Sequence, residues 1–269
     1  MVGLAVIGNI SVDRIVHPGA DRREVLGGAG LHVALAATRS GLHAAPISVI
    51  GGDLDGLPGD PRLSELDLSA VKTMSGASAT FMLTYDAVDN LVKVEANHGV
   101  AANLTCHAVQ YIGAGVADTY HVCCRTPLDI AAILDVLMRH RARFSLDFVI
   151  SSACGSIATA VSALPHARVV FANASEYALL SASIRMSLLP AVVVSDGPRP
   201  VHLFRRGRLV ATATPPMIIP VNPTGAGDTL AGAFLAAQAA GLPDAVALRH
   251  AVTAASAHTT RPALALDPR

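Results

Sequence analysis

The segment Val221-Asn-Pro-Thr-Gly-Ala-Gly-Asp-Thr-Leu-Ala-Gly-Ala-Phe234 decides how this chain folds. Apolar residues from Met217 to Val221 predict a short strand, and the alanine-rich stretch 226–240 predicts a long helix after the glycines. A glycine turn between a strand and a helix directs backbone N–H groups and the positive end of the helix dipole at one spot. Such a spot suits a phosphate group or a developing oxyanion.

Asp228 lies in the first turn of this predicted helix. Beside an anion-binding turn, a carboxylate is suited to act as a general base, which takes a proton from a hydroxyl while the turn holds the group under attack. A well-capped helix explains the same residues, because glycine permits the turn and the helix dipole favours an aspartate there. The rest of the chain has to decide between these two interpretations.

The composition indicates one large domain with neither a nucleic-acid nor a membrane partner. The chain has 269 residues, 52% of them apolar, and its 20 basic and 20 acidic residues cancel. No apolar run reaches the roughly 20 residues that span a bilayer, and residues 1–8 resemble a first strand more than a signal peptide. We interpret His121, Cys123 and Cys124 as buried strand residues, because the cysteines lack metal-ligand spacing. These features predict a reduced, cytoplasmic protein.

Strands and helices alternate along most of the chain. The first predicted strand, 4–10, ends near Asp13, which makes Asp13 either a candidate ligand at the carboxyl end of a strand or a turn residue. Four residues, Gly27-Gly28-Ala29-Gly30, precede a predicted helix and suggest close approach of the backbone to a ligand. Further strands are predicted at 47–50, 120–124, 144–149, 169–172 and 191–194, a hairpin at 201–204 and 209–214, and further helices at 128–139, 157–164 and 245–259.

Two β-rich runs, 80–85 and 91–96, interrupt this alternation. They predict a hairpin with a loop of about five residues, 86–90, in a small separate sheet. Phe81, Leu83 and Tyr85 would share one face of the hairpin. That face could cover a ligand or pack on a partner subunit.

Taken together, these segments resemble the ribokinase family, also called the PfkB carbohydrate kinases. Four motifs occur in the order of that family: Gly8-Asn9-Ile10-Ser11-Val12-Asp13, Gly27-Gly28-Ala29-Gly30, Asn173-x-x-Glu176 and Thr224-Gly225-Ala226-Gly227-Asp228. The resemblance covers essentially the whole chain, and the last motif is the specific one. It implies a single α/β domain over 1–269, a three-layer α/β/α sandwich with a mostly parallel central sheet. A small β-sheet lid would come from about 12–26 and 76–97.

The resemblance also implies an activity, the ATP-dependent transfer of the γ-phosphoryl group to a hydroxyl, usually a primary alcohol, with Mg²⁺. It assigns Asp228 as the catalytic base and Gly225, Ala226 and Gly227 as the anion hole. It assigns Ser11, Asp13, Gly27, Gly28, His32 and Arg125 to the acceptor; Asn173, Ser195, Gly197 and Thr224 to the nucleotide; and Glu176 to Mg²⁺ through water. The expected partners are ATP and a small-molecule acceptor, and a homodimer could form through the lid.

Three residues depart from the family pattern. Asn222 stands where an acid usually precedes the anion hole, next to a monovalent cation in many members, so dependence on potassium is doubtful. His32 stands in place of a frequent substrate-binding asparagine, and it can still donate or accept a hydrogen bond. Arg125 stands near an acidic sugar ligand of ribokinase proper. It could meet a phosphate or carboxylate of the acceptor, or simply face solvent.

These observations favour a kinase for a small sugar or sugar-like acceptor. A nucleoside acceptor remains open, because Phe81 and Tyr85 could stack on a base, and a phosphorylated sugar rests on Arg125 alone. A non-catalytic sensor of a nucleotide or sugar is the competing class, since Asn222 and His32 are altered. An oxidoreductase is disfavoured, because the dinucleotide-binding glycines and the ribose-binding acid are missing.

Overall fold

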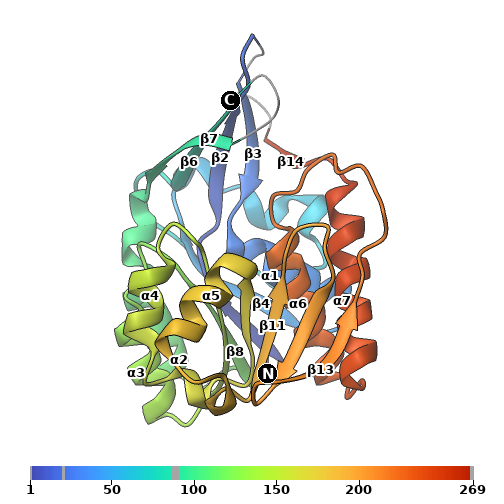
Figure 1. The fold of residues 1–269 in the computed structure, drawn as a ribbon. Coiled ribbons are helices and arrows are strands. Elements are labelled where there is room, and N and C mark those ends of the chain that lie inside the picture. The colour runs from blue at the N-terminus through green and yellow to red at the C-terminus, as the bar shows by residue number, and fades with distance from the viewer. Residues whose placement is uncertain (1, 20–21, 87–90, 267–269) are drawn as a thin grey trace.

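The computed structural model of the chain describes residues 2–19, 22–86 and 91–266 (Figure 1). Two sheets of unequal size dominate it, and helices cover both faces of the larger sheet. Within the described ranges, no helix has the length and apolar character that a bilayer crossing requires.

The larger sheet has nine strands and is parallel except at one edge. In spatial order the strands are β13 (Arg208–Ala213), β12 (Val201–Arg205), β11 (Ala191–Ser195), β10 (Val170–Asn173), β9 (Arg143–Phe148), β8 (Thr119–Cys124), β1 (Leu4–Ile7), β4 (Ala44–Ile50) and β5 (Val71–Thr73). The hairpin β12–β13 forms the antiparallel edge. Because both faces are covered, β1 and β11 are almost entirely apolar.

Successive side chains of each strand enter two different hydrophobic cores. In β1, Leu4 and Val6 pack into the core beneath α1 (Ala29–Arg39), α6 (Ala226–Ala239) and α7 (Asp244–Thr259). Ala5 and Ile7 pack into the other core, beneath α2 (Leu104–Gly113), α3 (Ile130–Arg139), α4 (Ala153–Ala160) and α5 (Ala174–Ser183). Alternation along the strand therefore gives the three layers seen in Figure 1, which confirms the predicted α/β/α sandwich.

The smaller sheet has five strands and projects beyond the ends of the larger one (Figure 1). Its order is β14 (Leu264–Ala265), β3 (Arg23–Gly27), β2 (Ser11–Val16), β6 (Ala79–Tyr85) and β7 (Leu91–Asn97). The predicted hairpin is confirmed by the antiparallel pairing of β6 with β7, while 87–90 of its loop lie outside the described residues. The sequence did not predict β14, which comes from the far end of the chain and pairs with β3.

The predicted strand 217–221 is wrong, because this segment is irregular. Met217 is 103% exposed and Ile219 is 91% exposed, so their side chains face solvent instead of a core. Pro215, Pro216 and Pro220 remove three backbone N–H donors that a strand would need. The helix predicted at 157–164 begins earlier, and a helix unforeseen at 104–113 packs against α3.

Helices α1 and α6 approach so closely that one position of α6 has no room for a side chain. A Cβ atom on Gly232 would lie 2.2 Å from the carbonyl oxygen of Val33 and 2.9 Å from Cβ of Ala36. Because α6 begins at the glycine turn, this contact fixes how the turn sits on the rest of the domain.

We expect Gly232→Ala to lower the free energy of unfolding by about 1–3 kcal/mol, because the added methyl group forces two backbones apart. Gly155→Ala in α4 is the matched control, since a Cβ there meets nothing within 4 Å. The control should be neutral or stabilising by up to about 1 kcal/mol. Urea unfolding of both variants checks this, and a Gly232→Ala protein as stable as the wild type would contradict it.

Candidate active site

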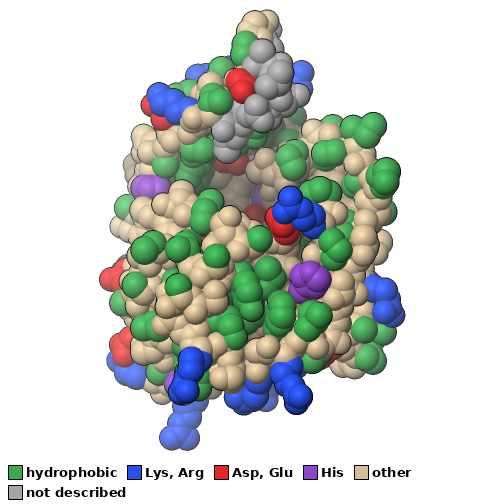
Figure 2. Space-filling view, viewed as in Figure 1, with side chains coloured by type: hydrophobic (Ala, Val, Ile, Leu, Met, Phe, Trp, Pro, Cys, Tyr) green, Lys and Arg blue, Asp and Glu red, His purple; other side chains and the backbone are tan. Residues whose placement is uncertain are grey.

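The candidate site lies where the strand order of the larger sheet reverses. β1 pairs with β4 on one side and with β8 on the other. The chain passes from β1 toward β4 and later returns to β8, and this reversal opens a crevice at the carboxyl ends of the strands. Figure 2 shows the surface hollowed between the projecting smaller sheet and the main body. Two adjoining spaces occur here, a cleft of about 190 Å³ over the larger sheet and a cavity of about 730 Å³ under the smaller sheet.

The glycine turn borders the cleft and begins α6. Gly225 has a φ of +81°, a conformation that favours glycine, and it caps the helix. Among the residues that the structure describes, the N–H groups of Gly225, Gly227 and Asp228 have no hydrogen-bond acceptor, whereas Ala226 N–H donates to the carbonyl of Pro223 at 3.2 Å. The turn therefore presents free donors at a helix N-terminus, as an anion hole requires.

Asp228 shares one guanidinium group with a second carboxylate. Arg125, just beyond β8, donates through Nη2 to Oδ2 of Asp147 at 2.6 Å, and the same nitrogen lies 3.5 Å from Oδ1 of Asp228. Burial raises the pKa of Asp228, and the charge of Arg125 lowers it. Arg125 thus pairs with two carboxylates at the cleft, where its side chain is 21% exposed, and it counteracts the cost of burying the carboxylate that was predicted to act as base.

Asn173, Glu176 and Ser195 also line the cleft. Asn173 and Ser195 are register partners at the carboxyl ends of β10 and β11. Asn173 Oδ1 accepts from the N–H of Glu176 at 2.9 Å, and Glu176 Oε2 accepts from the N–H of Asn173 at 2.8 Å. This capping box begins α5 and fixes both side chains at the cleft wall. Gly197, with φ of +55°, lies in the turn after β11 but does not line the cleft.

The larger cavity contains Asp13, which β2 places beneath the smaller sheet. Ser11 is fully buried and donates to Asp13 Oδ1 at 2.7 Å, so it orients this carboxylate and does not face the cavity. A Cβ atom on Gly27 would lie 2.1 Å from Asp13 Oδ2, and one on Gly28 would lie 2.3 Å from the carbonyl of Asn9. Both glycines therefore make room for the backbone and carboxylate around Asp13.

Burial raises the pKa of Asp13 to about 6, with a further upward contribution from the charge of Asp228 and a downward one from the Ser11 hydrogen bond. Asp13 and Asp228 thus lie close enough for their charges to interact, although Asp13 comes from β2 and Asp228 from α6 and they open into different spaces. An ionised carboxylate only accepts hydrogen bonds, so a molecule that binds both Asp13 and Asp228 has to donate a hydrogen bond to each.

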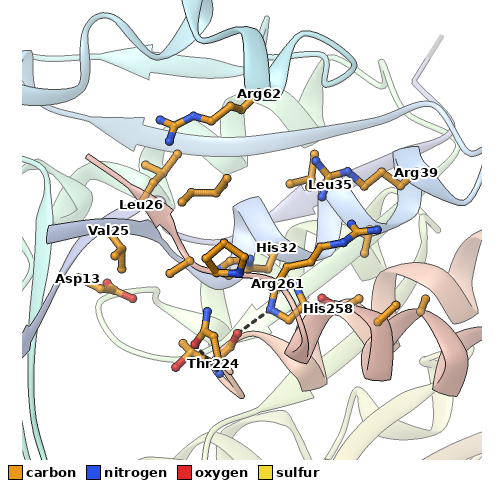
Figure 3. A pocket seen from close by; sticks show the side chains of 18 of the residues that line it. Asp13, Val25, Leu26, His32, Leu35, Arg39, Arg62, Thr224, His258 and Arg261 are labelled. Atoms are coloured by element: carbon orange, nitrogen blue, oxygen red, sulfur yellow. Dashed lines mark hydrogen bonds between the residues drawn. The ribbon is translucent and has the colours of Figure 1, made fainter. Parts of the chain in front are cut away.

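The rest of the cavity has an extended apolar wall, and its other lining side chains include His32, His258, Arg39, Arg62 and Arg261 (Figure 3). Ile15, Val25, Leu26, Leu83 and Leu35 supply much of the apolar wall. His32 and His258 meet edge to face, with ring centroids 5.5 Å apart. Burial lowers the pKa of His32 to about 4, assisted by the charges of His258, Arg125 and Arg39, so His32 is uncharged at neutral pH.

Some predicted site residues occupy places that the sequence could not reveal. Thr224, assigned to the nucleotide, lines the larger cavity instead of the cleft, and its N–H donates to Asn222 Oδ1 at 3.2 Å. Phe81 packs on His98, and the rings of Tyr85 and His17 stack with their centroids 4.9 Å apart. Neither aromatic ring lines the cavity, whereas Leu83, which lies between them in the strand, does.

Sequence reasoning assigned no role to Asp147 or His258. Asp147 is an acid inside an apolar strand, opposite Cys123 in the neighbouring strand, and that unusual position was the available signal. Its ligand atoms lie within 4.8 Å of those of His121 and Cys123. Burial raises the pKa of the Cys123 thiol well above its usual range, and Cys123 is 1% exposed, which confirms the interpretation as a buried strand residue.

Comparison with known proteins agrees with this geometry. The model of a family described as pfkB family carbohydrate kinase matches residues 2–268. The chain belongs to the PfkB family of carbohydrate kinases. A cytidine kinase of Thermococcus kodakarensis is 26% identical over 259 residues, which are 90% of this chain and 91% of that protein. As a PfkB family member, the chain is a kinase that transfers a phosphoryl group to a hydroxyl.

Two solved structures show the same fold as this PfkB kinase. A Burkholderia thailandensis nucleoside kinase in complex with inosine has a TM-score of 0.79 at 20% identity, and the match covers 96% of this chain and 92% of that one. A protein of E. coli described as ribokinase II, in complex with ATP and Mg²⁺, has a TM-score of 0.81 at 18% identity, with 98% and 94% covered.

The cleft fits ATP with Mg²⁺, the cofactors of a kinase of this kind. Its carboxylates are the hard oxygen ligands that Mg²⁺ prefers. Asp147 Oδ1 is buried and has no hydrogen-bond partner among the described residues, so it is one oxygen that the protein itself leaves unused. The free N–H groups of the glycine turn supply the complementary donors for phosphate oxygens.

The charge of Arg125 should set the pH at which Asp228 gains its proton. Arg125→Met removes the cation, so the pKa of Asp228 should rise and the acidic limb of the kcat profile should move up by about 1–3 pH units. Arg125→Lys keeps the charge and should move the limb less. The measurement is kcat against pH on protein shown to be folded, because Arg125→Met also leaves Asp147 buried without its partner. Identical acidic limbs in all three proteins would contradict this role.

Acceptor binding should weaken as Asp13 is protonated. We expect the Kd of the acceptor to rise as the pH falls through about 6, because the neutral carboxyl loses an acceptor site for hydroxyl groups. Since the raised pKa means that the folded state binds this proton more tightly than the unfolded chain, ionised Asp13 also lowers stability as the pH rises from about 4 to 6. Calorimetric titrations from pH 5 to 8 test the first effect, and Asp13→Asn should bind weakly without this step.

Proposed function

We propose that Asp228 is the general base for transfer of the γ-phosphoryl group of ATP to a primary hydroxyl, and that the acceptor is a nucleoside. One observation carries the catalytic part of the proposal. A carboxylate that is 16% exposed lies in the first turn of α6, beside N–H groups that have no partner among the described residues, and within electrostatic reach of Asp13. This arrangement supplies a base, an anion hole and an acceptor ligand at one boundary between two spaces.

In the proposed reaction, Asp13 accepts hydrogen bonds from hydroxyls of the acceptor and brings another hydroxyl to Asp228. Asp228 takes the proton of that hydroxyl. The hydroxyl oxygen forms a bond to the γ-phosphorus while the bond between this phosphorus and the ADP oxygen breaks. The N–H groups of Gly225 and Gly227 stabilise charge on the transferred group. Burial raises the pKa of Asp228, and the charge of Arg125 opposes that rise and so favours the ionised form that can take the proton.

ATP would lie over the carboxyl ends of β10 and β11, with its phosphates toward the glycine turn. Asn173, Ser195 and Gly197 would position it, and Glu176 would hold Mg²⁺ through water. When bound, Mg²⁺ would neutralise negative charge on the phosphates. The capping box supports these roles, because it fixes Asn173 and Glu176 before any ligand binds. Two roles of the smaller sheet remain predictions: that it acts as a lid that excludes water, and that it forms a dimer contact.

Three observations support a nucleoside acceptor over a free sugar. The cavity of about 730 Å³ is in the range of small-molecule sites and is larger than a pentose alone needs. Its apolar wall offers a surface for a base, with His32 as an uncharged polar group beside it. The cytidine kinase and the inosine-bound nucleoside kinase belong among the similar proteins. A sugar acceptor is the second candidate, supported by Asp13, whereas the internal pairing of Arg125 removes the reason to favour a phosphorylated sugar.

The acceptor is tested by ADP release with Mg²⁺ and ATP across nucleosides, pentoses, hexoses and phosphosugars. We expect kcat/KM to be highest for a nucleoside. Turnover confined to sugars would replace the nucleoside by the second candidate. ATP binding without turnover of any acceptor would favour the sensor function that the sequence left open.

Asp228→Asn should lower kcat by about 10²–10⁴-fold, because the amide cannot take the proton, while ATP should bind nearly as in the wild type. Asp135→Asn is the matched control, since Asp135 is an exposed aspartate of α3 that pairs only with Arg139 in the next turn. The control should keep its kcat. Turnover by Asp228→Asn near the wild-type rate would remove Asp228 as the base.

A further inference from the structure

His258, near the end of α7, reaches the glycine turn from behind. Its Nε2 atom lies 2.7 Å from the carbonyl oxygen of Thr224, the residue before Gly225 (Figure 3). A carbonyl oxygen can only accept, so Nε2 of His258 must carry a proton and donate it. This bond ties the last helix of the chain to the turn that begins α6.

The planarity of the peptide bond gives this contact a consequence for the cleft. In a trans peptide, the carbonyl of Thr224 and the N–H of Gly225 point in opposite directions. Thr224 lines the larger cavity, where His258 also lies, whereas Gly225 lines the cleft. A carbonyl held on the cavity side therefore turns the N–H of Gly225 toward the cleft, where it has no acceptor among the described residues.

Further contacts hold the same peptide in place. Asn222 Oδ1 accepts from the N–H of Thr224 at 3.2 Å, and the N–H groups of Val221 and Asn222 donate to the carbonyl of Thr259, next to His258. A Cβ atom on Gly225 would lie 3.0 Å from the ring of His32 and 3.2 Å from Nε2 of His258. The two histidines thus pack directly beneath the turn, which has no room to rotate toward them.

We propose that His258 is a positioning residue that aims the Gly225 N–H at the transferred phosphoryl group, because its Nε2–H holds the Thr224 carbonyl on the cavity side. The proposal rests on the proposed function, because it takes the Gly225 N–H to be part of the anion hole.

The test compares side chains of similar length with and without a donor. His258→Met should lower kcat by about 10–100-fold and change the KM of the acceptor by a smaller factor, because His258 also lines the acceptor cavity but a misaimed donor mainly costs transition-state stabilisation. His258→Gln can still donate to the carbonyl and should keep most of the wild-type kcat. Thr260→Ala is the control for disturbance of this helix end, since it removes a hydrogen bond to the Ala257 carbonyl and not to the turn.

A second measurement uses ammonium chloride as the probe, with sodium chloride at equal ionic strength as reference. His258→Ala opens space at the Thr224 carbonyl, so ammonium should raise its kcat at least about threefold and leave the wild type unchanged. An equal response in both proteins, or none in the variant, would overturn the role of His258 Nε2–H as the donor that holds the Thr224 carbonyl.

Three further outcomes separate this proposal from the proposed function. Equal kcat values for His258→Gln and His258→Met, or an equal loss in Thr260→Ala, would reduce His258 to a structural residue. An unaffected His258→Met together with an inactive Asp228→Asn would overturn the proposal about His258 alone. An active Asp228→Asn would overturn the proposed function first.

Discussion

One guanidinium group between two buried carboxylates is the interaction on which the site depends. Asp147 comes from β9, Asp228 from α6, and Arg125 follows β8, so their ion cluster joins three elements that are distant in sequence. A second buried carboxylate without a cation would be neutralised by protonation instead of staying ionised. The charge of Arg125 therefore offsets part of the cost of placing two acids in one cleft, because it lowers the pKa of the α6 carboxylate against the effect of burial.

Close backbone approach is the second constraint, and it explains why glycines mark this site. Gly27 leaves room for the carboxylate of Asp13, Gly28 for the carbonyl of Asn9, and Gly225 for the rings of His32 and His258. At each position a methyl group would collide with atoms that cannot move without displacing a candidate ligand. Because the constraint acts on single residues, it leaves a visible mark in the sequence, and the glycine motifs indicated the candidate site.

Features that depend on distant partners were harder to predict. The central strands and the long helices followed from apolar runs and glycine stops, which are local signals. The segment 217–221 has a strand-like composition but no neighbour to pair with, and β14 exists only because β3 offers it an edge. Arg125 was expected to meet the acceptor or solvent. Its direction is set by Asp147, 22 residues later, and no local pattern relates the two.

The two carboxylates proposed to handle the acceptor belong to different parts of the fold, a strand of the smaller sheet and a helix packed on the larger one, and this separation couples the fold to the chemistry. Asp13 lies on β2 of the smaller sheet, held by Ser11, while Asp228 lies on α6, held by the contact of Gly232 with α1. The distance between the two carboxylates therefore depends on how the smaller sheet and helix α6 are placed relative to each other. A misplacement of about 1 Å between reacting groups can cost on the order of 100-fold in rate. The contacts that join the two sheets, which include the direct passage from β1 into β2 and the pairing of β14 with β3, consequently determine how well an acceptor hydroxyl meets its base.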